Sequence, residues 1–215
     1  MKKSRNLTKG HLTAIYRFSI CSYSIPADQM SHISFKIMTE KEVNKIARKF
    51  ALSLIKSGFS IMRSAFKLEP EEVKMGDIES FLKKNFPKKT INLADARYKL
   101  ISIYKWKEII DVDWISWKKY IKNVSDCDNY AYYMAAVMSV VFNINSCGVI
   151  HGHVYDKYTG KWLYGHFWNG IIVKENGEFQ IYFLEPMNNK MVKVKKGQPV
   201  YFGRKKYSPL VFRFF

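Results

Sequence analysis

Cysteine is scarce in this chain, with only Cys21, Cys127 and Cys147 among 215 residues. So few thiols, and an odd number of them, exclude a disulfide framework, so each thiol has to be explained singly. Long apolar runs are also missing, since no stretch approaches the roughly 18 to 20 apolar residues that cross a bilayer. The basic start, residues 2–5, is followed by residues too polar for the core of a signal peptide. We therefore expect a soluble, intracellular protein that does not associate with a membrane.

Acidic residues are few as well, with 18 Asp and Glu against 36 Lys and Arg, which gives a formal net charge of +18. The excess of positive charge lies at the two ends. Residues 1–67 hold 13 basic and 3 acidic side chains, residues 186–215 hold 8 and none, and residues 68–185 hold 15 of each. The sequence therefore predicts a weak contact of the basic termini with a polyanion or nucleic acid, away from the neutral middle of the chain.

Apolar residues are plentiful enough for a packed core. Hydrophobic residues make up 47% of the chain and aromatic residues 16%, which excludes a disordered protein. Thr39 and Glu42 form a capping-box pattern before an apolar helical period that runs to Gly58. The same signals predict further helices over about 77–85 and 92–110.

After residue 145 the apolar period changes from 3.6 to 2, which indicates strands. We expect them over residues 147–155, 162–173, 179–185, 191–195, 198–202 and 207–214. Helices followed by an antiparallel β-sheet predict the α+β class. The predicted organisation is a basic helical N-terminal extension, residues 1–65, and a single domain, residues 66–215.

Cys127 lies where a helix is predicted to begin. Ser125 and Asp128 have the spacing of a capping box, and apolar residues follow at helical intervals. In the first turn of a helix, free amide groups and the helix dipole favour a thiolate. Asp126 and Asp128 oppose this by repulsion, so a reactive thiolate also needs an imidazolium nearby. Without one, Cys127 is an inert buried cysteine.

His166 and Glu185 are predicted to meet across a hairpin. If Asn176-Gly177 is a tight turn, Trp168 faces Glu185, and His166 lies diagonally from Glu185 on the same face. A carboxylate that holds one imidazole nitrogen directs the other toward a nucleophile, as in a catalytic triad. A four-residue loop would keep Glu185 on this face, but a loop of three or five residues would send it to the other face. If the two residues do not meet, His166 is instead a hydrogen-bonded core histidine and Glu185 a surface acid at the end of a strand.

Three stretches around these residues resemble a known group: DCDNYA (126–131), GHFWNGIIV (165–173) and FLEP (183–186). They resemble the papain-like and transglutaminase-like cysteine peptidases, most closely the C-terminal cysteine-protease domain of mushroom agglutinin lectins and related bacterial and phage proteins. The resemblance implies a papain-like core, with Cys127 as nucleophile, His166 as general base and acid, and Glu185 orienting His166. It also lets Trp168 shield the His166–Glu185 contact from water.

The implied function is a cysteine hydrolase, a peptidase or amidase, that acts on a protein or peptide substrate through a thioester. Transfer of the acyl group to an amine, as in a transglutaminase, would use the same residues. No cofactor is required, and although the resemblance implies calcium activation, no compact acidic loop offers ligands. The lectin domain of the agglutinins has no counterpart in this sequence, so the resemblance does not imply carbohydrate binding. In place of the usual glutamine, Tyr120, Asn123 and the backbone N–H of Cys127 are the candidate oxyanion donors.

Two other classes of protein fit parts of the sequence. His151 and His153 lie two apart on a predicted strand after Cys147, and with His166 they suggest a metal-binding module or metalloenzyme. The basic ends and the aromatic residues suggest a non-catalytic nucleic-acid-binding protein. Binding of that kind would weaken with salt and survive Cys127→Ala.

Overall fold

The structure is a computed structural model that describes residues 39–112, 120–122 and 125–215. The chain divides into two units between Phe50 and Ala51, and helix α1 (Glu40–Phe66) runs from the first into the second. All other described elements belong to the second unit. Within the described part of the chain, every helix is too short or too polar to span a bilayer.

Helix α1 begins where the sequence predicts. The backbone N–H of Thr39 donates to Oε2 of Glu42 at 2.8 Å, and the N–H of Glu42 donates to Oγ1 of Thr39 at 3.3 Å, which confirms the capping box. The predicted end at Gly58 is wrong, because the helix continues to Phe66. A helical glycine costs about 1 kcal/mol, and Phe59 and Phe66 offset this cost because they pack against the core.

Most of the predicted apolar face of α1 is exposed, because no other described residue covers it. Its large members are exposed by about half or more: Val43, Ile46, Phe50, Leu54 and Ile55. Only the C-terminal part of the helix therefore contributes to the core. The predicted division into residues 1–65 and 66–215 falls in the last turn of α1 and stays a prediction.

The segment after α1 contains three short strands and two helices. In order they are β1 (Glu71–Lys74), α2 (Met75–Asn85), β2 (Thr90–Leu93), β3 (Arg97–Leu100) and α3 (Ile103–Asp111). The helix predicted over 77–85 is confirmed as α2. The long helix predicted over 92–110 is wrong, because β2 pairs with residues 211–214 and β3 with residues 71–74. Only residues 103–111 are helical.

The described residues after α3 form one helix and six strands. They are α4 (Cys127–Phe142), β4 (Cys147–Asp156), β5 (Trp162–Glu175), β6 (Glu178–Glu185), β7 (Lys190–Lys193), β8 (Val200–Phe202) and β9 (Lys205–Phe214). The main sheet has the order β2-β9-β4-β5-β6-β7, and β8 pairs with β9. The α+β class is confirmed. The sheet is antiparallel except that β2 runs parallel to β9, so it is mixed rather than purely antiparallel. A papain-like core stays a prediction.

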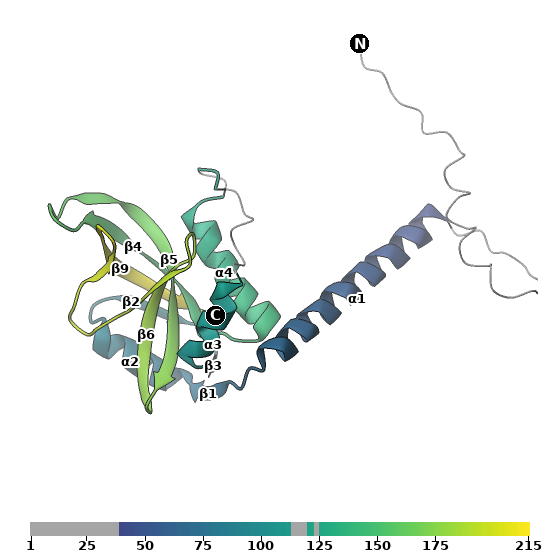
Figure 1. Ribbon diagram of the computed structural model, residues 1–215, viewed down its shortest axis with the longest axis horizontal. Coiled ribbons are helices and arrows are strands. Elements are labelled where there is room, and N and C mark those ends of the chain that lie inside the picture. Colours follow the sequence, from purple (N-terminus) through teal and green to yellow (C-terminus); the bar gives the residue numbers. More distant parts are fainter. Residues whose placement is uncertain (1–38, 113–119, 123–124) are drawn as a thin grey trace, which may run out of the picture. The chain divides into compact units, whose positions relative to one another are not determined.

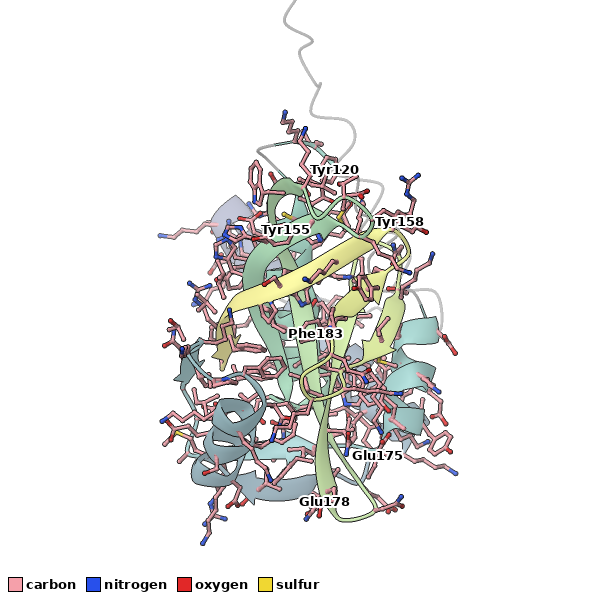
Figure 2. The ribbon with its side chains drawn as sticks, turned by 90° about the vertical axis from the view of Figure 1, so that its left-hand side faces the viewer. Tyr120, Tyr155, Tyr158, Glu175, Glu178 and Phe183 are labelled. Atoms are coloured by element: carbon pink, nitrogen blue, oxygen red, sulfur yellow. The ribbon has the colours of Figure 1, made fainter. Side chains whose placement is uncertain are left out.

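The β5–β6 hairpin has the predicted register. Asn176 and Gly177 have φ angles of 52° and 83°, the left-handed conformation that a tight hairpin turn needs. Ile172 pairs with Ile181, as expected from a two-residue turn. Figure 2 shows Glu178, beside this turn, at one end of the unit and Tyr120 at the opposite end, with Phe183 between them. The hairpin therefore runs from its turn toward the end of the unit where Tyr120 lies.

Both faces of the sheet are covered. On one face α3 and α4 pack against Val149, Ile171 and neighbouring side chains, and on the other α2 joins a core that includes Trp168 and Phe183. Figure 1 shows α4 and α2 on opposite sides of the sheet. Alternate residues of β4 and β5 therefore face different cores, so the side of the sheet that each of their polar side chains reaches is fixed by register.

Candidate active site

Cys127 is the first residue of α4. The residue that caps this helix is Asp126, not Ser125 as the sequence predicts, and the backbone N–H of Asp126 donates to Oδ1 of Asn129 at 3.2 Å. The cap lies one residue later because Asn129 returns the bond that a capping box requires. The prediction that Cys127 belongs to the first turn is confirmed, and its amide is among those that lack an acceptor within the helix.

The two carboxyl groups beside Cys127 do not act as two independent charges. The pKa of Asp128 is raised, mainly because its carboxyl group shares a hydrogen bond with Asp126 and also because it is partly buried. Protonation, which would lessen the repulsion of a thiolate at Cys127, therefore begins at a higher pH for Asp128 than for an isolated aspartate.

His166 and Glu185 form a buried pair. Nε2 of His166 lies 2.7 Å from Oε2 of Glu185, and the two residues are only 7% and 5% exposed. Cys127 is hydrogen-bonded to the same imidazole. Because Nε2 is taken by the carboxylate, Nδ1 is the ring nitrogen that remains for the sulfur. The structure thus brings the three predicted residues, Cys127, His166 and Glu185, into one chain of contacts.

The imidazole of His166 is held in its charged form. Burial lowers the pKa of His166, but the hydrogen bonds with Cys127 and Glu185 and the negative charges of those groups together raise it to about 9. At neutral pH the ring therefore carries two N–H groups, one directed to the carboxylate and one available to the sulfur. This supplies the imidazolium that a thiolate at Cys127 needs.

Glu185 has two further partners. The hydroxyl of Tyr207 donates to Oε2 at 2.7 Å, and the backbone N–H of Met187 lies 3.5 Å from Oε1. Burial, followed by the charge of Glu185, raises the pKa of Tyr207, so the phenol stays protonated as a donor. A buried carboxylate with a cation and two neutral donors is well satisfied, and its orientation is fixed.

Trp168 and Gly152 pack around the imidazole. The ring of Trp168 is fully buried and stacks on His166 with 6.1 Å between ring centres. Gly152 is the cross-strand partner of His166, and a Cβ atom at Gly152 would lie 2.6 Å from the indole ring. Trp168 lies where the sequence predicts a shield for the His166–Glu185 contact, and Gly152 leaves the space for it.

Asn169 connects α4 to the sheet. Its Nδ2 donates to the carbonyl of Ala131 at 2.8 Å and to the carbonyl of Gly148 at 3.1 Å, and the residue is fully buried. Ala131 lies one helical turn after Cys127. Asn169 therefore positions the helix that carries the sulfur against the strand that carries the imidazole.

The three residues line a cavity of about 580 Å³. Tyr120, one candidate oxyanion donor, lines this cavity. Asn123, the other side-chain candidate, lies outside the described residues. The volume is in the range of small-molecule binding sites, so a ligand of that size has room beside the sulfur.

The histidines of the metal hypothesis are not brought together. His166 faces Gly152 across the β4–β5 pair, so its side chain lies on the sheet face opposite to those of His151 and His153. In the described parts of the chain, no three His, Cys, Asp or Glu side chains lie close enough to hold a metal ion. Cys147 is buried, which raises its pKa and leaves it an inert thiol. Cys21 is outside the described residues.

Tyr207, Gly152 and Asn169 were not found by reasoning from the sequence. Asn169 carries a usable signal, because a polar residue inside the apolar run FWNGIIV needs a buried partner. Tyr207 carries none, because it reaches Glu185 only through the pairing of β9 with β4. Gly152 carries no signal either, because Trp168, the side chain that requires a glycine there, lies 16 residues further along the chain.

Comparison with known proteins gives limited similarity. No protein-family model matches the chain, and no curated protein matches it significantly. A solved structure described as "PSL1a-E64 complex" aligns with 66% of this chain and 51% of its own, at 17% identity and a TM-score of 0.46. A solved structure of Polyporus squamosus lectin bound to a human-type influenza-binding epitope aligns with 56% of this chain and with 45% of the lectin chain. The sequence identity is 19% and the TM-score is 0.42. The chain spans about half the length of these two solved chains, and membership of a peptidase family stays a prediction.

Proposed function

We propose that this chain is a cysteine hydrolase, a peptidase or amidase, that works through Cys127, His166 and Glu185. The observation that carries the proposal is the buried contact of 2.7 Å between His166 and Glu185, which leaves the other ring nitrogen to the thiol of Cys127. A nucleophile, a base and a residue that orients the base are the parts that a thiol-dependent acyl transfer requires.

In the first half-reaction, the thiolate of Cys127 attacks the carbonyl carbon of a peptide or amide, and the carbonyl oxygen becomes an oxyanion. The backbone N–H of Cys127, at the start of α4, is available to donate to it. The C–N bond then breaks, and the Nδ1 proton of His166 passes to the leaving amine. The products are a free amine and a thioester on Cys127.

In the second half-reaction, neutral His166 accepts a proton from water while the water oxygen attacks the thioester. The C–S bond breaks, and a carboxylic acid leaves as the thiolate and imidazolium are restored. An amine in place of water would give a new amide by the same steps. Peptidase and transglutaminase activity therefore differ only in the acceptor that reaches the thioester.

The test is alkylation of the full-length protein with limiting iodoacetamide, with the modified cysteines identified by mass spectrometry. We expect Cys127 to react in preference to Cys21 and Cys147, because it lies on the cavity wall beside an imidazolium while Cys147 is buried. His166→Ala should abolish the preference. Hydrolysis of denatured casein should be lost in Cys127→Ala.

The matched control is His151→Ala, which removes a histidine from the same sheet on the other face. It should leave the labelling of Cys127 unchanged, and thermal melting should establish that both variants are folded. Equal labelling of Cys127 in the wild type and in a folded His166→Ala would contradict the proposal. So would casein hydrolysis by Cys127→Ala.

A further inference from the structure

Three lysines lie on the wall of the cavity that holds Cys127: Lys122, Lys190 and Lys205. We infer that this cavity selects acidic peptides, with Asp or Glu side chains close to the bond that is cleaved. The inference rests on the proposed hydrolase function and adds the class of substrate. It follows from the positive charge that the lysines give to the cavity wall.

The carboxylates on the same wall are already engaged. Only Asp126 and Glu185 line the cavity among the described acidic residues. Glu185 is bound by His166 and Tyr207, and Asp126 shares a hydrogen bond with Asp128. Neither is therefore a free counter-ion for the lysines.

No described carboxylate lies within ion-pair distance of the three lysines. Lys205 instead lies over the ring of Tyr164, with Nζ 5.5 Å from the ring centre. Lys190 is the cross-strand partner of Glu185, at the point where β7 begins. The three ammonium groups therefore leave positive charge on the cavity wall that no described carboxylate neutralises.

Two of the three lysines come from the most basic segment of the chain. Lys190 and Lys205 belong to residues 186–215, the segment with eight basic and no acidic residues. Carboxylates of other strands pair with two of the eight, as in Lys193–Glu175 at 2.6 Å and Arg204–Asp156 at 4.0 Å. The lysines on the cavity have no such neighbour among residues 39–112, 120–122 and 125–215, so they are available to a carboxylate that a substrate brings.

An acidic peptide satisfies this site better than a neutral one. A carboxylate near an exposed ammonium contributes roughly a two- to fivefold effect per pair. Two or three such contacts should together favour Glu over the isosteric Gln by about tenfold in kcat/KM at low salt. Because the lysines are exposed to solvent, the preference should shrink as the salt concentration rises.

The experiment uses the full chain and two steps. First, a mixture of peptides from a denatured proteome is digested, and mass spectrometry identifies the cleaved bonds and the residues around them. Second, quenched fluorescent peptides built on a cleaved sequence compare Glu with Gln at each position next to the bond. We expect a Glu/Gln ratio of about ten in kcat/KM.

Two double variants test the lysines. Lys190→Gln with Lys205→Gln should lower the ratio to about two, because most of the favourable charge is removed. Lys195→Gln with Lys196→Gln makes the same change in net charge in the same segment, away from this cavity, and should leave the ratio unchanged. Lys190→Arg with Lys205→Arg should keep the ratio near ten, and its melting temperature checks that the positions tolerate substitution.

The outcomes separate the two proposals. Cleavage of peptides with equal rates for Glu and Gln would overturn the acidic preference and leave the hydrolase function standing. Equal loss of the ratio in both Gln double variants would also overturn it, because the effect would then come from overall charge. Failure to cleave any peptide or casein would overturn the hydrolase function, and the substrate class with it.

Discussion

Glu185 is the only described residue that contacts both His166 and Tyr207 through one oxygen atom. A carboxylate in this position has two effects on the imidazole, since it fixes the ring and favours the protonated form. Its own burial would be unfavourable without these donors. The state of His166 and the stability of this part of the fold are therefore coupled.

The first prediction concerns the titration of His166. In the wild type its imidazole should titrate at about pH 9, as followed by NMR of the ring protons or nitrogens. In Glu185→Gln the pKa should fall well below 9, because burial then acts with only Cys127 to oppose it. A value unchanged by Glu185→Gln would contradict the role given to this carboxylate. Glu175→Gln, on the same hairpin, is the control.

The same shift predicts how stability depends on pH. A histidine whose pKa is raised in the folded state stabilises the fold fully below its unfolded value, about 6.5. This contribution is lost as the pH rises through about 9. The difference in unfolding free energy between the wild type and His166→Gln, measured in urea, should therefore be larger at pH 6 than at pH 9.5.

Tyr207→Phe removes the second donor to Glu185. We expect a loss of about 1.5 to 3 kcal/mol in the free energy of unfolding, because a buried carboxylate loses a hydrogen bond. The pH profile of alkylation at Cys127 should also shift, which a purely structural role would not cause. Tyr201→Phe, in the adjoining strand, has no described bond to Glu185 and should change neither quantity by much. No shift in the profile would limit Tyr207 to packing.

At the scale of the elements, the helix α4 and the hairpin β5–β6 could be predicted from the sequence, and they carry the site. Both depend on local signals: a capping pattern, an apolar helical period and an Asn-Gly turn. The strands β2 and β3 could not be predicted, because each is stabilised by a partner far along the chain. A short apolar stretch with a remote partner has the same local pattern as a helix.

The close packing of β4 against β9 and Trp168 predicts the effect of Gly152→Ala. The added methyl group would collide with the carbonyl oxygen of Ser208 and with the indole of Trp168. We expect a loss of about 1 to 3 kcal/mol in unfolding free energy and slower alkylation of Cys127, because His166 packs on the displaced ring. Gly165→Ala meets no atom closer than 3.9 Å and is the control for stability. Equal stability of the two variants would contradict this account.

At the scale of the whole molecule, charge and chemistry are separated along the chain. Cys127, His166 and Glu185 all come from the neutral block, residues 68–185, while the excess of basic residues is at the two ends. The charge counts predict a polyanion contact for the termini, but they carry no information on the cavity. That two C-terminal lysines also reach the cavity wall follows only from the folded arrangement of β7 and β9.

This separation predicts independent behaviour of two activities. Binding to single-stranded DNA or heparin should weaken steeply between about 50 and 200 mM salt, because contacts of this kind release counter-ions. Cys127→Ala should leave that binding unchanged while it abolishes hydrolysis. Fluorescence anisotropy of a labelled oligonucleotide measures the first activity. A loss of binding in a folded Cys127→Ala would show that the two share a site.

The stack of His166 on Trp168 has a consequence for how the site is assembled. One ring nitrogen is bound to Glu185, the other faces the sulfur, and an indole covers one side of the ring. Turning the ring over would break both of these hydrogen bonds, so each nitrogen keeps its own partner in the folded protein. The orientation of the imidazole is therefore set when the chain folds, and the proposed hydrolysis needs no further rotation of the ring to bring its proton to the leaving amine.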